Sequence, residues 1–214
     1  MNFLKNKTVL VTGHTGFKGS WLCAWLVSMG ARVIGLSIDI PSIPSNFQVS
    51  KLQDLIEDYR IDICDFEKVS MVVEEAQPDF VFHLAAQALV LTSYLSPLKT
   101  IQTNALGTAS ILEAVRKLTK RVNIIMITSD KVYDNVEWTW GYRENDKLGG
   151  KDPYSASKGM AELAINTYVH SFFNKKDSNV RIAIGRAGNV IGGGDWAANR
   201  IVPDCMEAWS REAE

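Results

Sequence analysis

The chain has 214 residues, with 23 Lys and Arg against 24 Asp and Glu, and 46% of its residues are hydrophobic. This composition is typical of a water-soluble globular protein and excludes intrinsic disorder, collagen-like repeats and small disulfide scaffolds. The net charge of −1 and the scattered basic residues argue against a nucleic-acid partner.

The first predicted elements are a strand, a glycine-rich loop, a helix and a second strand. An apolar, β-branched run at 7–12 predicts the first strand, and three glycines follow it within 13–19. Apolar residues at helical spacing then predict a helix that Gly30 closes, and 32–38 is predicted as the second strand. The glycine loop is therefore expected to connect a strand to the start of a helix.

The same alternation continues through the rest of the chain. Further strands are predicted at 60–63, 79–86, 122–128 and 180–185, and further helices at 67–76, at about 104–118 and from near Pro153. The strand at 79–86 has almost no polar interruption, which predicts burial on both of its faces. This order predicts an α/β fold with a doubly wound parallel sheet, Rossmann-like, whose ligand binds outside the carboxyl ends of the strands. The segments 40–50 and 134–152 are expected to be irregular loops.

The glycine loop and the residues after the next two strands predict a dinucleotide site. Gly13-x-x-Gly16-x-x-Gly19 leaves backbone amides and a helix N-terminus free to face a pyrophosphate. Asp39, 20 residues after Gly19, can accept bonds from ribose hydroxyls and repel a 2′-phosphate, which favours NAD over NADP. A turn or cap residue is the alternative for Asp39. Asp62 can meet the adenine amino group, although a surface turn explains it nearly as well.

A tyrosine and a lysine near the start of one predicted helix suggest proton chemistry. Tyr154 and Lys158 are four residues apart, so they share a helix face, and a nearby cation can lower the pKa of a phenol. An ordinary surface pair is the alternative on spacing alone. The hydroxyls of Thr128 and Ser129, at the end of the strand at 122–128, are expected to reach the same cleft and favour the functional interpretation.

Asp130 and Lys131 follow these hydroxyls directly and suggest an elimination reaction. An acid beside a potential amine base can remove a carbon-bound proton and protonate a leaving hydroxyl, steps that hydride transfer alone does not need. Lys131 would have to lose its proton, which desolvation and neighbouring cations can permit. The alternative for the pair is a salt-bridged turn.

Several other polar and aromatic residues have open interpretations. Arg186, Asn189 and Arg200 lie around the flexible glycines 192–194 and suit a diphosphate, although Arg186 can equally be structural. The aromatic side chains of Trp138, Trp140 and Trp196 are expected to serve packing more often than to form sugar or base platforms. We interpret His14 as a polar turn residue, whereas His83 and His170 show no partner pattern; none of the three is assigned a role in chemistry.

Four motifs carry a resemblance to a known family. The segments 11–22 (VTGHTGFKGSWL), 128–135 (TSDKVYDN), 140–144 (WGYRE) and 186–196 (RAGNVIGGGDW) resemble the extended short-chain dehydrogenase/reductase superfamily and, within it, sugar-nucleotide 4,6-dehydratases that act on CDP-glucose. Matching segments run from about residue 8 to about residue 205. The resemblance implies a tightly held NAD and a nucleotide-sugar substrate, CDP-glucose.

The resemblance also implies which positions bind these molecules. Cofactor contacts are expected at Gly13, His14, Thr15, Gly16, Phe17, Lys18, Gly19, Asp39, Asp62, Ile63, Leu84, Ala85, Ala86, Thr103, Thr128, Tyr154 and Lys158, and substrate contacts at Gln87, Ser129, Asn189 and Arg200.

By this resemblance, five residues carry the reaction. Tyr154 takes the 4-hydroxyl proton, Lys158 lowers its pKa and holds the ribose, and Ser129 bonds the same oxygen. Asp130 protonates the departing 6-hydroxyl, and Lys131 stands, as the candidate C5 base, where related dehydratases have Glu. The expected product is CDP-4-keto-6-deoxyglucose. The alternatives are a sugar-nucleotide 4-epimerase and an inactive NAD-binding module.

Length and composition bound the remaining expectations. Residues 1–188 are expected to form the NAD-binding domain and 189–214 the start of a truncated substrate-binding domain, with a homodimer as the assembly implied by the resemblance. Cys23, Cys64 and Cys205 are widely spaced, which predicts buried small side chains in a reducing cytoplasm and no metal site. Without a signal peptide, or an apolar stretch of the ~18 residues that a membrane span requires, we expect a cytoplasmic protein with no membrane partner.

Overall fold

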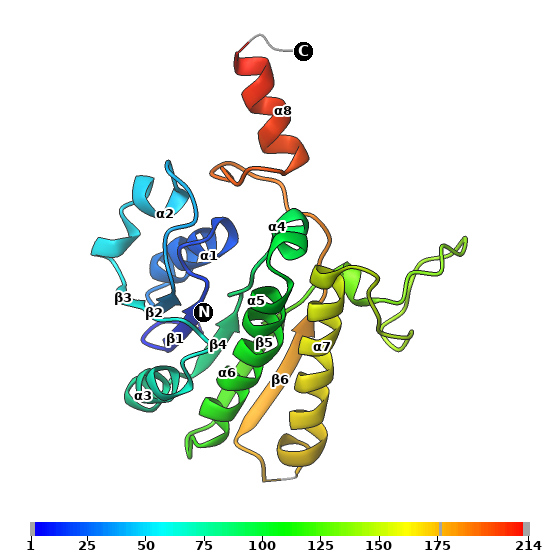
Figure 1. Ribbon diagram of the computed structural model, residues 1–214. Coiled ribbons are helices and arrows are strands. Elements are labelled where there is room, and N and C mark those ends of the chain that lie inside the picture. The colour runs from blue at the N-terminus through cyan, green and yellow to red at the C-terminus, as the bar shows by residue number, and fades with distance from the viewer. Residues whose placement is uncertain (1–2, 176, 212–214) are drawn as a thin grey trace.

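Six parallel strands form a single sheet in the computed structural model, which describes residues 3–175 and 177–211. The strands are β1 (Thr8–Thr12), β2 (Arg32–Ser37), β3 (Glu57–Arg60), β4 (Phe80–His83), β5 (Val122–Ile127) and β6 (Val180–Gly185). Their order across the sheet is β3-β2-β1-β4-β5-β6, so the winding direction reverses between β1 and β4 (Figure 1). This order confirms the predicted doubly wound Rossmann-like fold and places the expected ligand site at that reversal.

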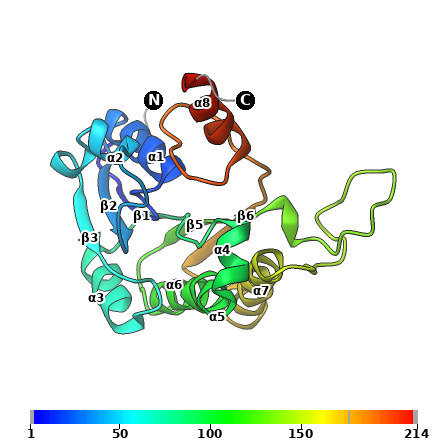
Figure 2. The ribbon, with the colours of Figure 1, turned by 45° about the horizontal axis from the view of Figure 1, so that its top comes forward.

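Helices lie on both faces of the sheet (Figure 2). One face carries α1 (Phe17–Ser28), α2 (Asn46–Val49) and a short turn at Leu52–Asp54. The other face carries α3 (Phe66–Ala76), α6 (Gly107–Arg116) and α7 (Pro153–Tyr168), the last continued by a π-helical turn at Val169–Phe173. Before α6 come α4 (Val90–Leu95), α5 (Pro97–Ile101) and a π-helical turn at Gln102–Leu106, and α8 (Ile201–Ser210) lies apart from the sheet.

The alternation of side chains along the strands builds two apolar cores. Leu10 of β1 points into the larger core with Val81, Ile124 and the buried faces of α3 and α6. Val9 and Val11 point to the opposite face, where they pack with helix α1. Burial of such side chains is worth about 25 cal/mol per Å² of apolar surface removed from water, so both helical layers stabilise the sheet.

Two predictions about the strands were wrong. The third strand lies three residues earlier than 60–63, because Glu57 to Arg60 pair with β2 while Ile61 and Ile63 bury their side chains beyond the strand end. The strand β4 is not buried on both faces: Val81 is fully buried but Phe80 and Phe82 are only partly covered. Few side chains cover that half of the sheet, since α1 packs mainly on β1 and β2.

The predicted loop at 134–152 leaves the body as a projecting arm (Figures 1 and 2). A single antiparallel bridge between Tyr133 and Leu148 closes its base, where Lys147 also pairs with Asp134 at 2.9 Å. Within the described ranges 3–175 and 177–211, no helix is both long and apolar enough to cross a membrane.

Candidate active site

The glycine loop adopts the conformation that a pyrophosphate-binding turn requires. Gly13 has a positive φ of +74°, and a Cβ there would lie 2.7 Å from the amide nitrogen of Ala85. A Cβ at Gly19 would lie 2.1 Å from the carbonyl oxygen of Gly13. Gly16 begins α1 without a side-chain cap, and the first turn of α1 holds no acidic residue. The loop is therefore packed too closely for side chains, and the helix N-terminus suits an anion.

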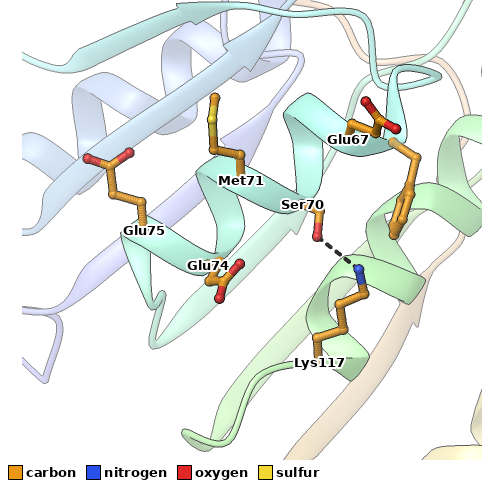
Figure 3. A pocket seen from close by; sticks show the side chains of 7 residues that line it. Glu67, Ser70, Met71, Glu74, Glu75 and Lys117 are labelled. Carbon is orange, nitrogen blue, oxygen red and sulfur yellow. Dashed lines mark hydrogen bonds between the residues drawn. The ribbon is translucent and has the colours of Figure 1, made fainter.

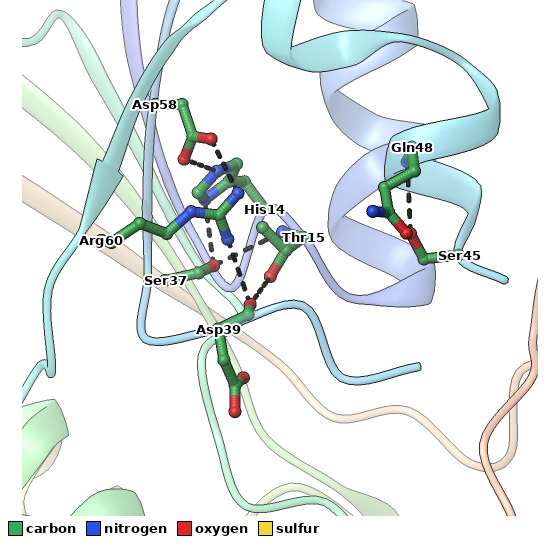
Figure 4. Close-up of polar contacts among 8 residues, drawn as sticks. All are labelled: His14, Thr15, Ser37, Asp39, Ser45, Gln48, Asp58 and Arg60. Carbon is green, nitrogen blue, oxygen red and sulfur yellow. Dashed lines mark hydrogen bonds and ion pairs between the residues drawn. The ribbon is translucent and has the colours of Figure 1, made fainter. Parts of the chain in front are cut away.

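His14 lies in the turn of the glycine loop, as interpreted from the sequence. Its side chain is fully buried, where one ring nitrogen contacts the Asp58 carboxylate at 2.8 Å and the other contacts the Ser37 hydroxyl at 2.9 Å (Figure 4). Burial lowers its pKa despite the carboxylate of Asp58. A Cβ at Gly35 would collide with the ring, so the imidazole fills space that this glycine leaves open. The buried His14 side chain therefore packs beneath the glycine loop against β2 and helps to fix the loop's position.

Asp39 lies two residues beyond β2, where the ribose carboxylate was predicted. Its carbonyl oxygen accepts a bond from the Thr15 hydroxyl at 2.6 Å and from the Arg60 guanidinium at 3.2 Å. Its carboxylate points away from these contacts (Figure 4). The guanidinium of Arg60 also donates to Asp58 at 2.7 Å, which neutralises the cation nearest to Asp39. The exposed carboxylate is thus available to ribose hydroxyls.

The residues expected at the adenine side follow the edge strand β3 or lie in the π-helical turn before α6. The Asp62 carboxylate accepts bonds from the amide of Cys64 and from Lys99, both at 2.9 Å, and these bonds lower its pKa against the opposing effect of burial. Ile63 is buried against Gly107. Thr103 is partly buried in the π-helical turn before α6.

Beyond β4, the loop with Leu84, Ala85 and Ala86 is held by a buried polar chain. The Thr12 hydroxyl accepts bonds from the amides of Leu84 and Ala85 and contacts Nδ1 of His83 at 2.8 Å. Nε2 of His83 contacts the Thr108 hydroxyl, which itself donates to the carbonyl of Asn104. These bonds require the neutral tautomer with hydrogen on Nε2, and burial lowers the pKa of His83 to about 3.

His83 therefore has partners that its sequence neighbours do not reveal: Thr12 is 71 residues away and Thr108 is 25 residues away. The chain continues through Asn104, whose side chain bonds both the amide and the carbonyl of Gln87 and also Ser157 of α7 at 2.8 Å. One buried network thus joins β1, the loop after β4 and helix α7.

The side chain of Gln87, a predicted substrate contact, bonds within its own loop. Its amide nitrogen donates to the carbonyl of Leu89 and to the Thr100 hydroxyl, and its amide oxygen accepts from the backbone of Leu89. Both hydrogens of the side-chain amide are therefore used within its own loop. Its role in this geometry is to shape the loop.

Tyr154 and Lys158 lie on the first two turns of α7, which begins as predicted. Asp152 caps the helix by accepting from the amides of Tyr154 and Ser155, both at 3.0 Å, and Pro153 occupies the first turn. Tyr154 and Lys158 are both buried, with 8% and 7% of their surface exposed. The surface pair that spacing alone would allow is therefore excluded.

The phenol of Tyr154 and the ammonium of Lys158 both have shifted pKa values. Burial raises the pKa of Tyr154, while a hydrogen bond with Ser129 and the charge of Arg200 lower it. Burial and, to a smaller extent, the charge of Lys18 together lower the pKa of Lys158 to about 8. A buried cation near a second cation favours an anionic ligand, such as the phosphate and ribose end of a dinucleotide.

Asp130 and Lys131 lie in a short helical turn, Asp130–Val132, directly after the strand β5. Both side chains are exposed. The Asp130 carboxylate accepts a bond from the Ser129 hydroxyl at 3.0 Å, and the ammonium of Lys131 lies 5.9 Å from the centre of the Tyr154 ring. Among the described residues, no ion pair joins Asp130 to Lys131, so the predicted alternative of a salt-bridged turn does not hold.

Thr128 departs from the expected hydroxyl pair in the cleft. Its hydroxyl donates to the carboxylate of Glu162 at 2.6 Å instead of facing the cleft beside Ser129. Glu162 is fully buried and also accepts three hydrogen bonds from the guanidinium of Arg186, at 2.8, 3.1 and 2.5 Å. Arg186 therefore has the structural role that was its alternative, and no diphosphate is needed to explain it. Glu162 was not predicted, although its position four residues after Lys158 was a usable signal.

Asn189 and Arg200 lie on the loop between β6 and α8, which passes over the glycine loop. Asn189 is exposed, and Arg200 bonds Asp195 at 2.9 Å. The glycines of this loop meet helix α1: the carbonyl of Gly193 accepts from the Trp21 indole at 2.8 Å. Lys18 also projects from α1, and burial together with the charge of Arg200 lowers its pKa. These contacts hold the loop against the start of α1.

The aromatic residues of the projecting arm form a stack. Tyr133 and Tyr142 are stacked with ring centres 4.9 Å apart, and Trp138 lies against both Tyr142 and Trp140. Trp138 and Trp140 thus contact each other within the arm, Trp196 is exposed elsewhere, and the packing interpretation of the three stays a prediction.

Other features lie away from this cleft. A hollow of about 680 Å³ on the outside of α3 and α6 is lined by Glu67, Glu74, Lys117 and their neighbours, none of them a predicted site residue (Figure 3). The prediction for cysteines holds only for Cys23, because Cys64 and Cys205 are partly exposed. Over residues 3–175 and 177–211, no group of acidic, histidine and cysteine side chains is arranged to hold a metal ion.

Comparisons with known proteins agree with this geometry. The family model described as GDP-mannose 4,6-dehydratase matches residues 10–184. CDP-glucose 4,6-dehydratase of Salmonella typhimurium is 50% identical over 216 residues, covering 100% of this chain and 60% of the relative. UDP-glucose 4-epimerase of Thermotoga maritima, solved with UDP-glucose, has a TM-score of 0.83 at 25% identity, covering 97% of this chain and 64% of the other.

A dTDP-glucose 4,6-dehydratase from Streptomyces venezuelae, solved with NAD, has a TM-score of 0.82 at 21% identity. It covers 96% of this chain and 62% of the other, and at this identity it supports the fold alone. The chain thus spans less than two thirds of the length of these relatives.

Proposed function

Because the chain belongs to the GDP-mannose 4,6-dehydratase family, we propose that it forms the cofactor-binding part of a sugar-nucleotide 4,6-dehydratase that converts CDP-glucose to CDP-4-keto-6-deoxyglucose. The observation that carries this proposal is the burial of Tyr154 and Lys158 on one face of α7, with the Lys131 ammonium of the turn after β5 lying 5.9 Å from the centre of the Tyr154 ring. The 50% identity to the Salmonella enzyme supports CDP-glucose as the substrate.

NAD is the proposed cofactor, and the residues fit it. The close packing at Gly13 and Gly19 leaves room only for backbone, as a pyrophosphate turn demands. The exposed carboxylate of Asp39 and the pairing of Arg60 with Asp58 favour a free ribose hydroxyl over a 2′-phosphate. When bound, NAD supplies the acceptor and donor for hydride at the sugar carbons.

The proposed oxidation step uses the residues of α7 and of the end of β5. Tyr154 takes the proton of the sugar 4-hydroxyl, and the Ser129 hydroxyl bonds the same oxygen. Lys158 supplies positive charge beside this pair and holds the ribose, while the burial of both side chains keeps water away. A bound cofactor cation adds to the charge that stabilises the phenolate, which burial alone disfavours.

The proposed elimination uses the turn after β5. Oxidation at C4 acidifies the C5 hydrogen, which Lys131 removes, and Asp130 protonates the 6-hydroxyl as it leaves as water. Both side chains are exposed at the mouth of the strand and carry no mutual ion pair in the described structure, which leaves them available to a substrate. A 4-epimerase needs neither group, because no water leaves.

For the chain as a whole, we propose the division expected from the sequence. Residues 1–188 form the NAD-binding domain, and 189–214 begin the substrate-binding part, with Asn189 and Arg200 on the substrate. The arrangement of α8 apart from the sheet supports this boundary.

A homodimer is the proposed assembly. Apolar side chains project from α4, α5 and α7 on one side of the molecule, namely Leu91, Tyr94, Leu95, Leu98, Met160 and Leu163, each at least 42% exposed. Such a patch is typical of a protein interface. Sedimentation velocity should show a dimer that Leu163→Glu dissociates; a monomer at all concentrations would contradict the assembly but not the enzymatic proposal.

The decisive experiment is incubation of the chain with NAD and CDP-glucose, followed by mass spectrometry. A product lighter by one water is expected. An unchanged mass with an inverted C4 centre would establish the epimerase instead. Calorimetry that detects NAD binding without CDP-glucose binding, together with no product, would establish the inactive binding module.

A further inference from the structure

A buried ion pair lies behind the turn that carries the proposed acid and base. The Glu162 side chain is 0% exposed and that of Arg186 is 17% exposed, and their closest atoms are 2.5 Å apart. Glu162 lies on α7 one helical turn after Lys158 and two turns after Tyr154, so the three side chains share a face of the helix. Arg186 directly follows β6.

Each member of the pair holds one end of the turn. Glu162 accepts the hydroxyl of Thr128, the residue before Ser129, at 2.6 Å. Arg186 donates to the hydroxyl of Tyr133, the residue after Val132, at 2.8 Å, and its guanidinium stacks 4.8 Å from the centre of that ring. The segment from Ser129 to Val132 is therefore fixed on both sides by groups from α7 and β6.

The pair makes two further contacts that reach the same region. Arg186 donates to the carbonyl of Glu144 in the projecting arm at 3.0 Å. The backbone of the turn is joined to the segment after Arg186, since the amide of Asp130 donates to the carbonyl of Ala187 at 3.1 Å. A displacement of Arg186 would thus be transmitted to the turn through side-chain contacts and through a backbone hydrogen bond.

Stability alone is a poor explanation for this arrangement. Removing two charges from water costs free energy that their attraction often only offsets, and apolar residues can replace a buried pair without loss of stability. What apolar residues cannot supply is the forked geometry in which one guanidinium contacts a carboxylate, a phenol and a carbonyl. The arrangement therefore fits a role in fixing directions and distances.

We propose that Glu162 and Arg186 are positioning residues that hold the Ser129–Lys131 turn in register with Tyr154 and Lys158. They act through Thr128 and Tyr133 and touch neither substrate nor cofactor themselves. The inference rests on the proposed function for its chemical meaning, because the turn carries the hydroxyl, acid and base of that reaction.

The test compares local with global protection of backbone amides in the full chain by hydrogen exchange and NMR. In Glu162→Gln and in Arg186→Lys, the amides of Asp130 and Val132 should exchange faster than in wild type. Their rates should rise at least about tenfold more than the rates of the core amides of β1. Thr128→Val, which removes a single hydroxyl, should give the same pattern more weakly. The last variant keeps the proposal testable if Glu162→Gln does not fold.

A matched control is Glu57→Gln, which breaks the bidentate pair between Glu57 and Arg32 at the opposite edge of the sheet. Its turn amides should keep wild-type protection. In both Glu162→Gln and Arg186→Lys, the exchange rates of the turn amides could instead change by the same factor as those of the core amides. That result would show that the pair is merely structural and would overturn the proposal.

Turnover gives a second, separate readout. With CDP-glucose and NAD, Arg186→Lys should lower kcat about tenfold and leave KM nearly unchanged, since the turn is displaced but the binding surface remains. Wild-type protein that makes no dehydrated product would contradict the proposed function, whereas the exchange result would still decide whether the pair holds the turn.

Discussion

The predicted site residues lie in two regions, here called the floor and the rim, that differ in how they are built. The floor consists of the glycine loop 13–19, the loop 84–87 and the start of α7 at 154–158; the rim consists of the arm 134–152 and the loop 188–200. The floor segments are connected through buried hydrogen bonds, because Thr12 accepts from the amides of the loop 84–87 and Asn104 bonds both Gln87 and Ser157. Rim residues are mostly exposed and bond to near neighbours, as Tyr142 does to Asn135.

This difference shows which region of the molecule has its polar groups held in one arrangement. In the described structure, the side-chain nitrogen and oxygen atoms that are fully buried all have hydrogen-bond partners. The floor therefore has one low-energy arrangement, because any displacement would leave a buried polar group unpaired. The rim residues are mostly exposed, so a displacement there leaves fewer buried polar groups unpaired.

The largest effect is expected where the floor is packed most tightly. Gly19→Ala places a Cβ 2.1 Å from the carbonyl oxygen of Gly13, which the loop can relieve only by moving. We expect a loss of about 3 kcal/mol in the free energy of unfolding and no measurable NAD binding. Urea unfolding and calorimetry measure both quantities.

The matched change on the rim is Gly141→Ala, where a Cβ would meet nothing within 4 Å. Its unfolding free energy should stay within about 0.5 kcal/mol of wild type. Equal destabilisation by the two substitutions would remove the distinction between floor and rim.

Removing the hydroxyl of a tyrosine should affect turnover strongly in the floor and weakly in the rim. Tyr154→Phe removes the proposed proton acceptor and should lower turnover by about 10²–10⁴-fold with a nearly unchanged melting temperature. Tyr142→Phe removes a rim hydroxyl that bonds only Asn135 and the amide of Val136, and it should keep turnover within about twofold of wild type. Initial rates of product formation and thermal unfolding test the pair; a Tyr154→Phe variant with wild-type turnover would remove the phenol from the mechanism.

The burial of the charged Lys158 side chain should lower the free energy of unfolding of the chain. Its pKa falls to about 8 in the folded chain, below its value in the unfolded chain, so the charged form is destabilised by folding. Stability should therefore rise with pH between about 8 and 10.5, where only the unfolded chain keeps the proton.

Lys158→Met should accordingly stabilise the chain without cofactor by about 2–3 kcal/mol at pH 7 and by only about 1 kcal/mol at pH 9.5. Urea unfolding at the two pH values measures this. A variant less stable than wild type at pH 7 would show that the ammonium is well solvated or paired in the folded state.

The smallest effect is expected at the tip of the arm. Trp140 is 64% exposed and contacts Trp138 at a ring-centre distance of 5.6 Å. Trp140→Ala should change the unfolding free energy by less than about 0.5 kcal/mol and leave NAD affinity unchanged. Weaker NAD binding in this variant would mean that the rim and the floor are coupled.

Patterns of local sequence predicted the frame of the molecule well. The apolar runs gave β1, β2, β5 and β6, and the glycine spacing gave the turn before α1, because these features depend on neighbours in the chain. The strand β3 was misplaced because its polar residues, Glu57 to Arg60, lie at the edge of the sheet while the apolar Ile61 follows it.

Buried polar contacts were much harder to predict. His14 pairs with Asp58 and His83 with Thr108 across long stretches of sequence, and nothing adjacent to either histidine indicates its partner. The same holds for Glu162 and Arg186, which are 24 residues apart. Such contacts depend on which segments the fold brings together, so only the structure identified them.

The measurement that tests the central claim most directly is the fate of deuterium in CDP-glucose labelled at C4. If the proposed oxidation, elimination and return of hydride take place, the product should be dehydrated and should carry the deuterium at C6. Deuterium that stays at C4 in a product of unchanged mass would contradict the dehydratase, as would labelled substrate that remains unconverted in the presence of bound NAD.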